Sequence, residues 1–305
     1  MKNFKGGTAV ITGAGSGFGL ETSRIAAERG MNVVMADVQQ DALDRAAAEV
    51  RALGAQVLPF RLDVAHAAEV EALGAATKAR FGAPSIVFNN AGVGVGGLIW
   101  ENSAADWAWV LGVNVMGVAH GIRVFTPMML EAAAKDSRYE GHIVNTASMA
   151  GLVNAPNMGV YNASKHAVVA MSETLYQDLQ LVTDQIGASV LCPFFVPTGI
   201  TESQRNRPDA LAAEAPTKSQ LIGKAMNDRA VGRGKVSAAD VARFVFEAIA
   251  KRRFYIYSHP QSLASVQTRL DDIMQSRDPT DPFAARPAVG AELRAALRGT
   301  PPGAP

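Results

Sequence analysis

The chain has 305 residues, of which 48% are hydrophobic and 19% are charged, as in ordinary globular proteins. Its 29 lysines and arginines against 28 aspartates and glutamates give a formal net charge of +1, which provides no overall attraction for nucleic acid or an anionic membrane. The single cysteine, Cys192, excludes an internal disulfide and a multi-thiolate metal site, and the histidines show no metal-ligand spacing, so we expect no metal. There is no apolar leader and no long uninterrupted apolar run, so we expect a cytoplasmic protein without a membrane span.

Short apolar runs rich in valine and isoleucine alternate with helical patterns along the first two-thirds of the chain. The runs are residues 8–12, 32–36, 56–60, 85–89, 142–146 and 188–192. Clear helical patterns cover residues 19–29, 41–53 and 67–80. Continuous apolarity is typical of strands that are buried on both faces, as in a parallel sheet. The alternation therefore predicts an α/β fold with a doubly wound parallel sheet.

The pattern changes after residue 197. Residues 198–233 are polar and interrupted by prolines, which predicts an insertion packed over the sheet. A helix at 238–250 and a strand at 253–258 then complete the alternation. The last 30 residues contain six of the 15 prolines, so we expect an extended tail with little structure beyond a short helix at 292–298.

A glycine-rich stretch follows the first apolar run and opens a helical pattern. Gly13, Gly17 and Gly19 have the spacing G-x-x-x-G-x-G. Glycines allow a tight turn and a close approach of the backbone to an anion, and a helix N-terminus offers free N–H groups. We therefore expect this turn, including Ser16 and Phe18, to bind the pyrophosphate of a dinucleotide.

Asp37 ends the second apolar run, 24 residues after Gly13. An acidic residue at about this spacing accepts a hydrogen bond from the adenosine ribose and repels the additional phosphate of NADP. No neighbouring residue in the sequence supplies a compensating positive charge, so NAD is the predicted cofactor.

Tyr161 and Lys165 lie four residues apart, at the start of a helical pattern over about residues 159–183. Residues four apart share one face of a helix, and a nearby ammonium lowers the pKa of a phenol, which makes proton exchange with an alcohol feasible. Ser148 closes the fifth apolar run, and Asp63 and Asn90 follow the third and fourth. In a doubly wound sheet these positions share the crevice where ligands bind.

Together, T-G-x-x-x-G-x-G at 12–19, N-N-A-G at 89–92, Asn114, Ser148 and Y-x-x-x-K at 161–165 resemble the short-chain dehydrogenase/reductases. The resemblance covers roughly residues 5–260 and is closest to an NAD-preferring type with an extended C-terminal tail. It implies a seven-stranded Rossmann-like sheet with helices on both faces, in a single domain. It also implies assembly as a homotetramer or homodimer through helices at about 104–134 and 159–183.

The resemblance implies roles for individual residues. Ser148, Tyr161 and Lys165 would form the catalytic site, and Asn114 would hold a water molecule that relays protons to Lys165. The implied cofactor contacts are Asp63 and Val64 at the adenine, Asn90, Ala91 and Gly92 near the ribose and backbone, Tyr161 and Lys165 at the nicotinamide ribose, and Val196 and Thr198 at the carboxamide. Residues 1–260 would be the dinucleotide-binding catalytic domain with 198–235 as a substrate lid, and 261–305 a C-terminal helix and proline-rich extension.

Phe194 departs from the family pattern, which has glycine after this proline. It is either the wall of a pocket for an apolar substrate or a core-packing residue. The predicted function is NAD-dependent interconversion of a secondary alcohol and a ketone, with a bulky hydrophobic or aryl substrate. The alternative is a dinucleotide-binding sensor or scaffold without catalysis. Epimerase or dehydratase chemistry fits less well, because those relatives usually have another glycine spacing.

Overall fold

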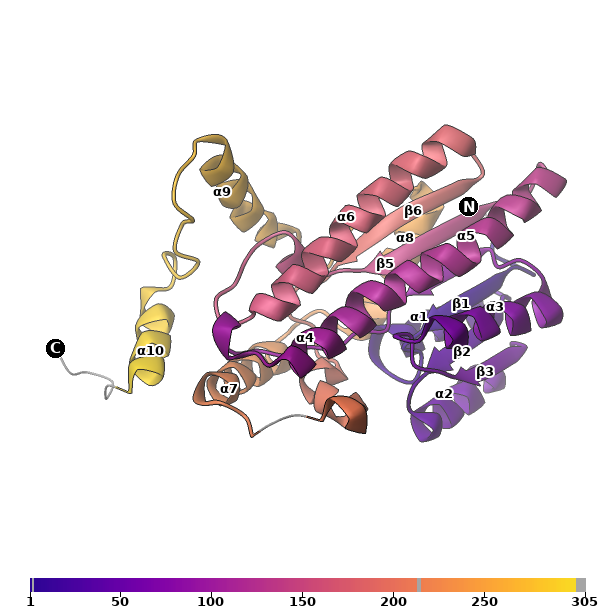
Figure 1. Ribbon diagram of the computed structural model, residues 1–305. Helices are drawn as coiled ribbons and strands as arrows, with labels where there is room; N and C mark the ends of the chain where they lie inside the picture. Colours follow the sequence, from indigo (N-terminus) through magenta and orange to yellow (C-terminus); the bar gives the residue numbers. More distant parts are fainter. Residues whose placement is uncertain (2, 213–214, 300–305) are drawn as a thin grey trace.

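Seven parallel strands form one sheet in the order β3-β2-β1-β4-β5-β6-β7 (Figure 1). The computed structural model describes residues 1, 3–212 and 215–299. The strands are β1 (Thr8–Thr12), β2 (Asn32–Asp37), β3 (Val57–Arg61), β4 (Ile86–Asn89), β5 (Gly141–Thr146), β6 (Ile186–Cys192) and β7 (Tyr255–Tyr257). Every neighbouring pair is parallel. The predicted seven-stranded, doubly wound sheet is therefore confirmed.

Helices cover both faces of this sheet (Figure 1). On one face lie α1 (Gly17–Glu28), α2 (Gln40–Ala52) and α8 (Ala238–Lys251). On the other face lie α3 (Ala67–Phe81), α4 (Ala104–Leu111), α5 (Gly117–Lys135) and α6 (Gly159–Val182). Successive strand residues point to opposite faces, so Ile11 packs with the first group and Val10 with the second. This double burial is why the strands are apolar throughout.

The strand order reverses at β1, which has β2 on one side and β4 on the other. The connections that leave β1 and β4 run to opposite faces of the sheet, so a crevice opens between them at the carboxyl ends of the strands. Residues that follow β1, β2, β4 and β5 are thereby brought to one edge, although the sequence separates them widely. This edge carries the candidate site.

One continuous helical segment, Ala104–Lys135, is long and apolar enough to cross a membrane by length and composition, contrary to the expectation from uninterrupted apolar runs. It comprises α4, a π-helical turn (Gly112–Met116) and α5. Half of its most apolar window is buried, and Phe125 and Met129 are fully buried among the core residues beneath the sheet. The buried half of its apolar side chains belongs to the core.

The bounds of the seven strands and of the helices that cover the sheet agree with the sequence prediction to within two residues at each end. Those of the C-terminal region do not. For the last 30 residues the sequence predicts an extended tail with one short helix at 292–298, whereas α10 (Pro287–Arg298) begins five residues earlier and follows α9 (Leu263–Met274). Pro287 starts α10, where a missing N–H costs nothing because that group has no helical partner. Pro301, Pro302 and Pro305 lie outside the described residues.

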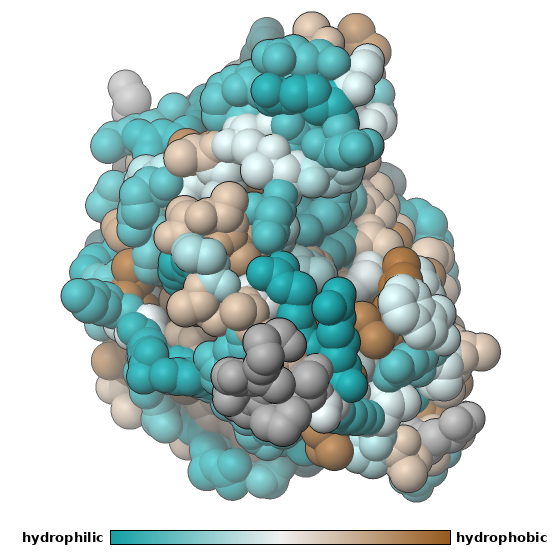
Figure 2. All heavy atoms as spheres, turned by 90° about the vertical axis from the view of Figure 1, so that its left-hand side faces the viewer, coloured by the Kyte–Doolittle hydropathy of each residue, from teal (hydrophilic) through white to brown (hydrophobic). Residues whose placement is uncertain are grey.

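Between β6 and α8 the chain forms two 3₁₀ segments, Gly199–Asn206 and Asp209–Leu211, and then α7 (Lys218–Gly232). The C-terminal helix α10 packs against α7. Figure 2 shows this side of the molecule, where hydrophilic residues predominate and hydrophobic ones are scattered among them.

The turn between β1 and α1 depends on its glycines. Gly13 and Gly17 have φ values of +65° and +54°, a region that favours glycine. A Cβ on Gly19 would lie 2.1 Å from the carbonyl oxygen of Gly13, so only glycine allows the first turn of α1 to pack this closely on the preceding loop.

Gly19→Ala should therefore destabilise the fold, because its methyl group meets backbone atoms that have no room to move. We expect the free energy of unfolding to fall by about 1–3 kcal/mol, measured by urea denaturation. Gly232→Ala is the matched control, since a Cβ there meets no atom within 4 Å. It should change stability by less than about 0.5 kcal/mol. Equal stability of the two variants would contradict this account of the turn.

Candidate active site

A cleft of about 710 Å³ opens at the carboxyl ends of the strands, within the usual range for small-molecule sites. The predicted site residues that line it are Gly13, Ser16, Gly17, Phe18, Asp37, Asp63, Val64, Asn90, Ala91, Gly92, Ser148, Tyr161, Lys165, Val196 and Thr198. Gly19 and Asn114 do not line it. Gly19 lies behind the turn, and Asn114 is fully buried behind the loop that follows β4.

Thr12 holds the two strands of the switch point together. Its Oγ1 accepts hydrogen bonds from the backbone N–H groups of Asn90 (2.9 Å) and Ala91 (3.1 Å). The Asn90 side chain donates in return to the Thr12 carbonyl (3.0 Å) and accepts from the Thr146 hydroxyl (3.3 Å). Thr12 and Thr146 are not among the predicted site residues, although a hydroxyl at the end of a buried strand is a usable signal.

Asp37 extends from the end of β2 toward the glycine turn. One carboxylate oxygen accepts from the Gly15 N–H (2.9 Å) and the other from the Gln39 N–H (3.0 Å). The carboxylate has no ion-pair partner among the described residues, but the sheet brings one basic residue near it that the sequence does not place there. Arg61, opposite Asp37 in the β2–β3 register, donates to the Val38 carbonyl (3.3 Å), although it does not line the cleft. Because Asp37 and Arg61 are 24 positions apart, the sequence does not reveal this proximity.

These residues fit a dinucleotide. A Cβ on Gly13 would lie 3.0 Å from the Cα of Ala91, so the strand end stays open only without a side chain there. Ser16 precedes α1 without making a side-chain cap, which leaves the first N–H groups of the helix available to an anion. The Asp37 carboxylate then lies where a ribose hydroxyl would donate.

Tyr161, Lys165 and Ser148 converge on the same part of the cleft. Tyr161 lies in the first turn of α6 and Lys165 one turn later. The Lys165 Nζ donates to the Thr146 carbonyl at the end of β5 (2.9 Å) and lies 5.6 Å from the centroid of the Tyr161 ring. Ser148 follows β5 and accepts from the Ala150 N–H (3.1 Å). A phenol, an ammonium and a hydroxyl thus face one space, which suits proton exchange with an alcohol or ketone.

Burial affects the two titrating groups in opposite directions. It raises the pKa of Tyr161, and a hydrogen bond with the Ser148 side chain partly opposes that shift. It lowers the pKa of Lys165 to about 8. From the sequence we expect the ammonium to lower the pKa of the phenol, whereas in this structure the pKa of Tyr161 is raised and desolvation is the main cause. Tyr161 is therefore a neutral phenol at neutral pH in the chain without cofactor.

Asn114 lies in the π-helical turn and supports the site from behind. Its Oδ1 accepts from the Val93 N–H (2.8 Å), and its Nδ2 donates to the Val93 carbonyl (2.9 Å) and to the Ser164 hydroxyl (3.0 Å). A Cβ on Gly92 would lie 3.4 Å from Asn114 Oδ1 and 3.5 Å from Lys165 Nζ. Gly92 therefore keeps the space between the amide and the ammonium free, and π-helical turns of this kind are frequent at functional sites.

Two phenylalanines form another part of the wall. Phe194 and Phe195 line the cleft, and their ring centroids are 4.4 Å apart. Phe194 is 39% exposed and its ring meets the edge of His259. Of the two alternatives for Phe194, the structure favours the pocket wall over core packing.

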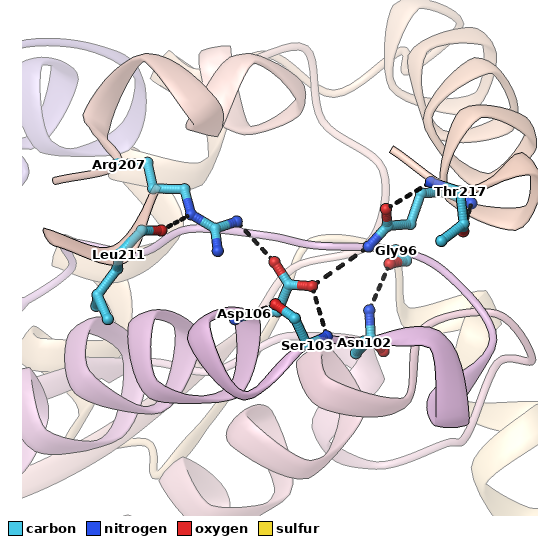
Figure 3. A network of polar contacts seen from close by, with 8 residues as sticks. Gly96, Asn102, Ser103, Asp106, Arg207, Leu211 and Thr217 are labelled. Atoms are coloured by element: carbon cyan, nitrogen blue, oxygen red, sulfur yellow. Dashed lines mark hydrogen bonds and ion pairs between the residues drawn. The ribbon is translucent and has the colours of Figure 1, made fainter. Parts of the chain in front are cut away.

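The segment after β6 is fastened to α4 by a buried ion pair that the sequence analysis misses (Figure 3). Arg207 Nη1 lies 2.6 Å from Asp106 Oδ1, with side-chain exposures of 4% and 6%. The other Asp106 oxygen accepts from the Ser103 N–H (3.0 Å) and the Gln220 side chain (3.3 Å). The Arg207 guanidinium also lies 5.1 Å from the centroid of the Trp109 ring. The sequence does not predict this pair, because no local pattern links Asp106 and Arg207, which are 101 positions apart.

Comparison with known proteins finds similar proteins over almost the whole chain, and they are named dehydrogenases or reductases. Residues 7–209 match a family model described as short chain dehydrogenase. A crystal structure from Burkholderia phymatum, described as a short chain dehydrogenase/reductase in complex with NAD, is 55% identical, has a TM-score of 0.90, and is matched over 93% of this chain and 100% of that one. The CLA biosynthesis dehydrogenase/reductase of Lactiplantibacillus plantarum is 32% identical over 92% of this chain and 97% of its own length. The C alpha-dehydrogenase of Sphingobium sp. is 28% identical over 95% and 93%.

The lowered pKa of Lys165 predicts a pH-dependent stability that Lys165→Met removes. Between about pH 8 and about pH 10 the unfolded lysine holds its proton and the folded one does not, so wild-type stability rises with pH. The stability advantage of Lys165→Met over wild type should therefore shrink by about 3 kcal/mol from about pH 7 to about pH 10, measured by urea denaturation.

Lys224→Met is the control for this experiment. Asp228 and Glu202 raise the pKa of Lys224, so its contribution to stability has the opposite sign and is lost as pH rises. A difference between Lys165→Met and wild type that does not change with pH would contradict a lowered pKa for Lys165.

Proposed function

The chain belongs to the short-chain dehydrogenase family, and on this basis we propose that it is an NAD-dependent oxidoreductase that interconverts a secondary alcohol and a ketone. The observation that carries the proposal is the convergence of Tyr161, Lys165 and Ser148 on a cleft whose other end is a glycine turn at a helix N-terminus. A sensor or scaffold would need the turn but not the three side chains, so this convergence favours catalysis.

In the oxidation direction, Tyr161 as phenolate takes the proton of the alcohol hydroxyl, and the hydrogen on the same carbon leaves as hydride. The nicotinamide ring of the bound cofactor supplies the hydride acceptor. Ser148 donates to the substrate oxygen and stabilises its negative charge. Lys165 provides positive charge next to the phenol and holds the nicotinamide ribose, and Asn114 holds a water molecule that returns protons to Lys165.

In the reduction direction, Tyr161 gives its proton to the nascent alkoxide. The raised pKa of Tyr161 keeps the phenol protonated at neutral pH, which suits this direction, whereas oxidation is favoured at alkaline pH.

We assign NAD, rather than NADP, on the position of Asp37. Its carboxylate faces the glycine turn, where the additional phosphate of NADP would meet a negative charge. The relative from Burkholderia phymatum is described in complex with NAD, which agrees with this assignment. Asp63 and Val64 at the adenine, Asn90 to Gly92 along the backbone, and Val196 and Thr198 at the carboxamide complete the proposed cofactor contacts.

The proposed substrate is a bulky hydrophobic or aryl secondary alcohol. Apolar side chains line part of the cleft, among them Val95, Met158, Phe194, Phe195, Ile200 and Leu221. A relative in Sphingobium is named a C alpha-dehydrogenase, and one in Streptomyces exfoliatus a 1-deoxy-11-beta-hydroxypentalenate dehydrogenase. The second of these names gives a substrate larger than a simple alcohol.

We further propose that residues 198–235 form a lid over the substrate, within a catalytic domain of residues 1–260 to which 261–305 is an extension. The lid proposal is supported by the many cleft-lining residues of the segment after Val196 and by its attachment to α4 through Asp106. A homodimer or homotetramer in the cytoplasm is the proposed setting. Exposed Leu181 and Val182 at the end of α6 support an assembly through that helix.

The function is tested by following the absorbance of reduced nicotinamide over aliphatic, steroidal and aryl secondary alcohols, with NAD and with NADP. We expect turnover with NAD and an aryl or other bulky alcohol. Tyr161→Phe should lose at least about 100-fold in turnover while NADH affinity changes little, because only the proton acceptor is removed. Retained turnover in Tyr161→Phe would refute the role of the phenol. NADH binding by the wild type without turnover on the whole panel would favour the sensor alternative.

Asp37→Ala should relax the choice of cofactor. Removing the carboxylate eliminates repulsion of the additional phosphate and leaves Arg61 nearby to attract it, so NADP turnover should rise about 10-fold relative to NAD. The double variant Asp37→Ala/Arg61→Ala is the control and should gain much less. Unchanged selectivity in Asp37→Ala would show that the carboxylate does not determine cofactor choice.

A further inference from the structure

The cleft has no excess of positive charge for an anionic cofactor. Its lining includes four carboxylates, Asp37, Asp63, Glu101 and Asp106, and four basic side chains, Lys165, Arg205, Arg207 and Lys224. A pyrophosphate carries two negative charges, so it matters which basic side chain remains free to meet it. This question rests on the proposed function, since it concerns the dinucleotide itself.

Three of the basic side chains are already engaged. Lys165 is buried and donates to the carbonyl of Thr146 beneath Tyr161. Arg207 is paired with buried Asp106 (Figure 3). Lys224 pairs with Asp228 (2.8 Å) and Glu202 (3.2 Å) on the lid segment.

Arg205 differs from these three. Its Nη1 donates to the backbone carbonyls of Gly199 (2.9 Å) and Glu202 (2.8 Å), which fixes the direction of the guanidinium. Among residues 1, 3–212 and 215–299 no carboxylate forms an ion pair with it, and its Nε and Nη2 have no hydrogen-bond acceptor. A preorganised guanidinium with three unused N–H groups therefore remains exposed at the cleft.

The position of Arg205 relates it to the glycine turn. Its Nη2 lies 2.8 Å from the Cβ position of Gly199, which directly follows Thr198. The Thr198 methyl group in turn lies 3.5 Å from the Cβ position of Gly17, the first residue of α1. That helix has no side-chain cap from Ser16 and no acidic residue in its first turn. The positive end of α1 and the Arg205 guanidinium thus flank the same short stretch of the cleft.

We propose that Arg205 binds the pyrophosphate of the cofactor from the lid side, opposite the N-terminus of α1. The fork of a guanidinium matches phosphate oxygens, and charge-assisted hydrogen bonds of this kind are strong. Since Arg205 belongs to the 3₁₀ segment Gly199–Asn206, the cofactor phosphates also hold the beginning of the lid in place. Cofactor binding thereby fixes the position of this part of the lid before the substrate packs against it.

The test compares wild type with Arg205→Gln by calorimetric titration with NADH, ADP and adenosine, which differ in whether they carry phosphate. We expect Arg205→Gln to weaken NADH and ADP about 10-fold and to leave adenosine unchanged. The salt dependence of ADP affinity should also become less steep. Arg233→Gln, at the exposed end of α7 outside the cleft lining, is the matched control and should match wild type for all three ligands.

Unchanged ADP affinity in Arg205→Gln would overturn the proposal while leaving the proposed function intact. Equal weakening of ADP and adenosine would also overturn it, because it would indicate a distorted segment rather than a lost phosphate contact. If the wild type binds none of the three ligands, the proposed function itself fails, and the role of Arg205 fails with it.

Discussion

The site depends on the hydrogen bonds that join the carboxyl ends of β1 and β4 through the Thr12 hydroxyl. These strands are neighbours in the sheet although Thr12 and Asn90 are 78 positions apart in the sequence. Their connections leave toward opposite faces, and the crevice between them receives the glycine turn from one side and the loop after β4 from the other. Asn90 extends the same network to β5 through the Thr146 hydroxyl, and the carbonyl of Thr146 positions Lys165. The glycine turn and Lys165 are thus connected by one continuous set of polar contacts.

Burial gives this site its acid–base character. The surroundings that raise the pKa of Tyr161 also lower that of Lys165, because both charged forms lose their hydration. Exposed tyrosine and lysine have nearly equal pKa values, of about 10 and about 10.4, so burial moves the two apart. The hydrogen bond with the Ser148 side chain partly opposes this rise at the phenol. Desolvation thus favours the neutral phenol and amine over the charged phenolate and ammonium.

Much of the fold and site could be predicted, because the signals are local. Double burial makes each strand a continuous apolar run, and the four-residue spacing of Tyr161 and Lys165 follows from one helical turn. What could not be predicted depends on contacts between distant segments. Asp106 meets Arg207 across 101 residues, and Arg61 approaches the Asp37 region only through strand register. Asn114 bonds the backbone of Val93, which carries no side-chain signal. Proline composition also misled, since a proline at the start of α10 is compatible with a helix.

The buried pair of Asp106 and Arg207 constrains how molecules enter and leave the cleft. Separating the two side chains would leave an uncompensated charge in a dry environment, at a cost of several kcal/mol. Motions that keep the two side chains together cost far less free energy, so we expect the pair to stay formed while the residues around it move. We therefore expect ligands to enter and leave on either side of this ion pair, past the 3₁₀ segment Gly199–Asn206 or past α7. We do not expect the whole segment between β6 and α8 to move away as one unit. With the pair intact, we expect the cleft to stay partly formed while ligands are exchanged.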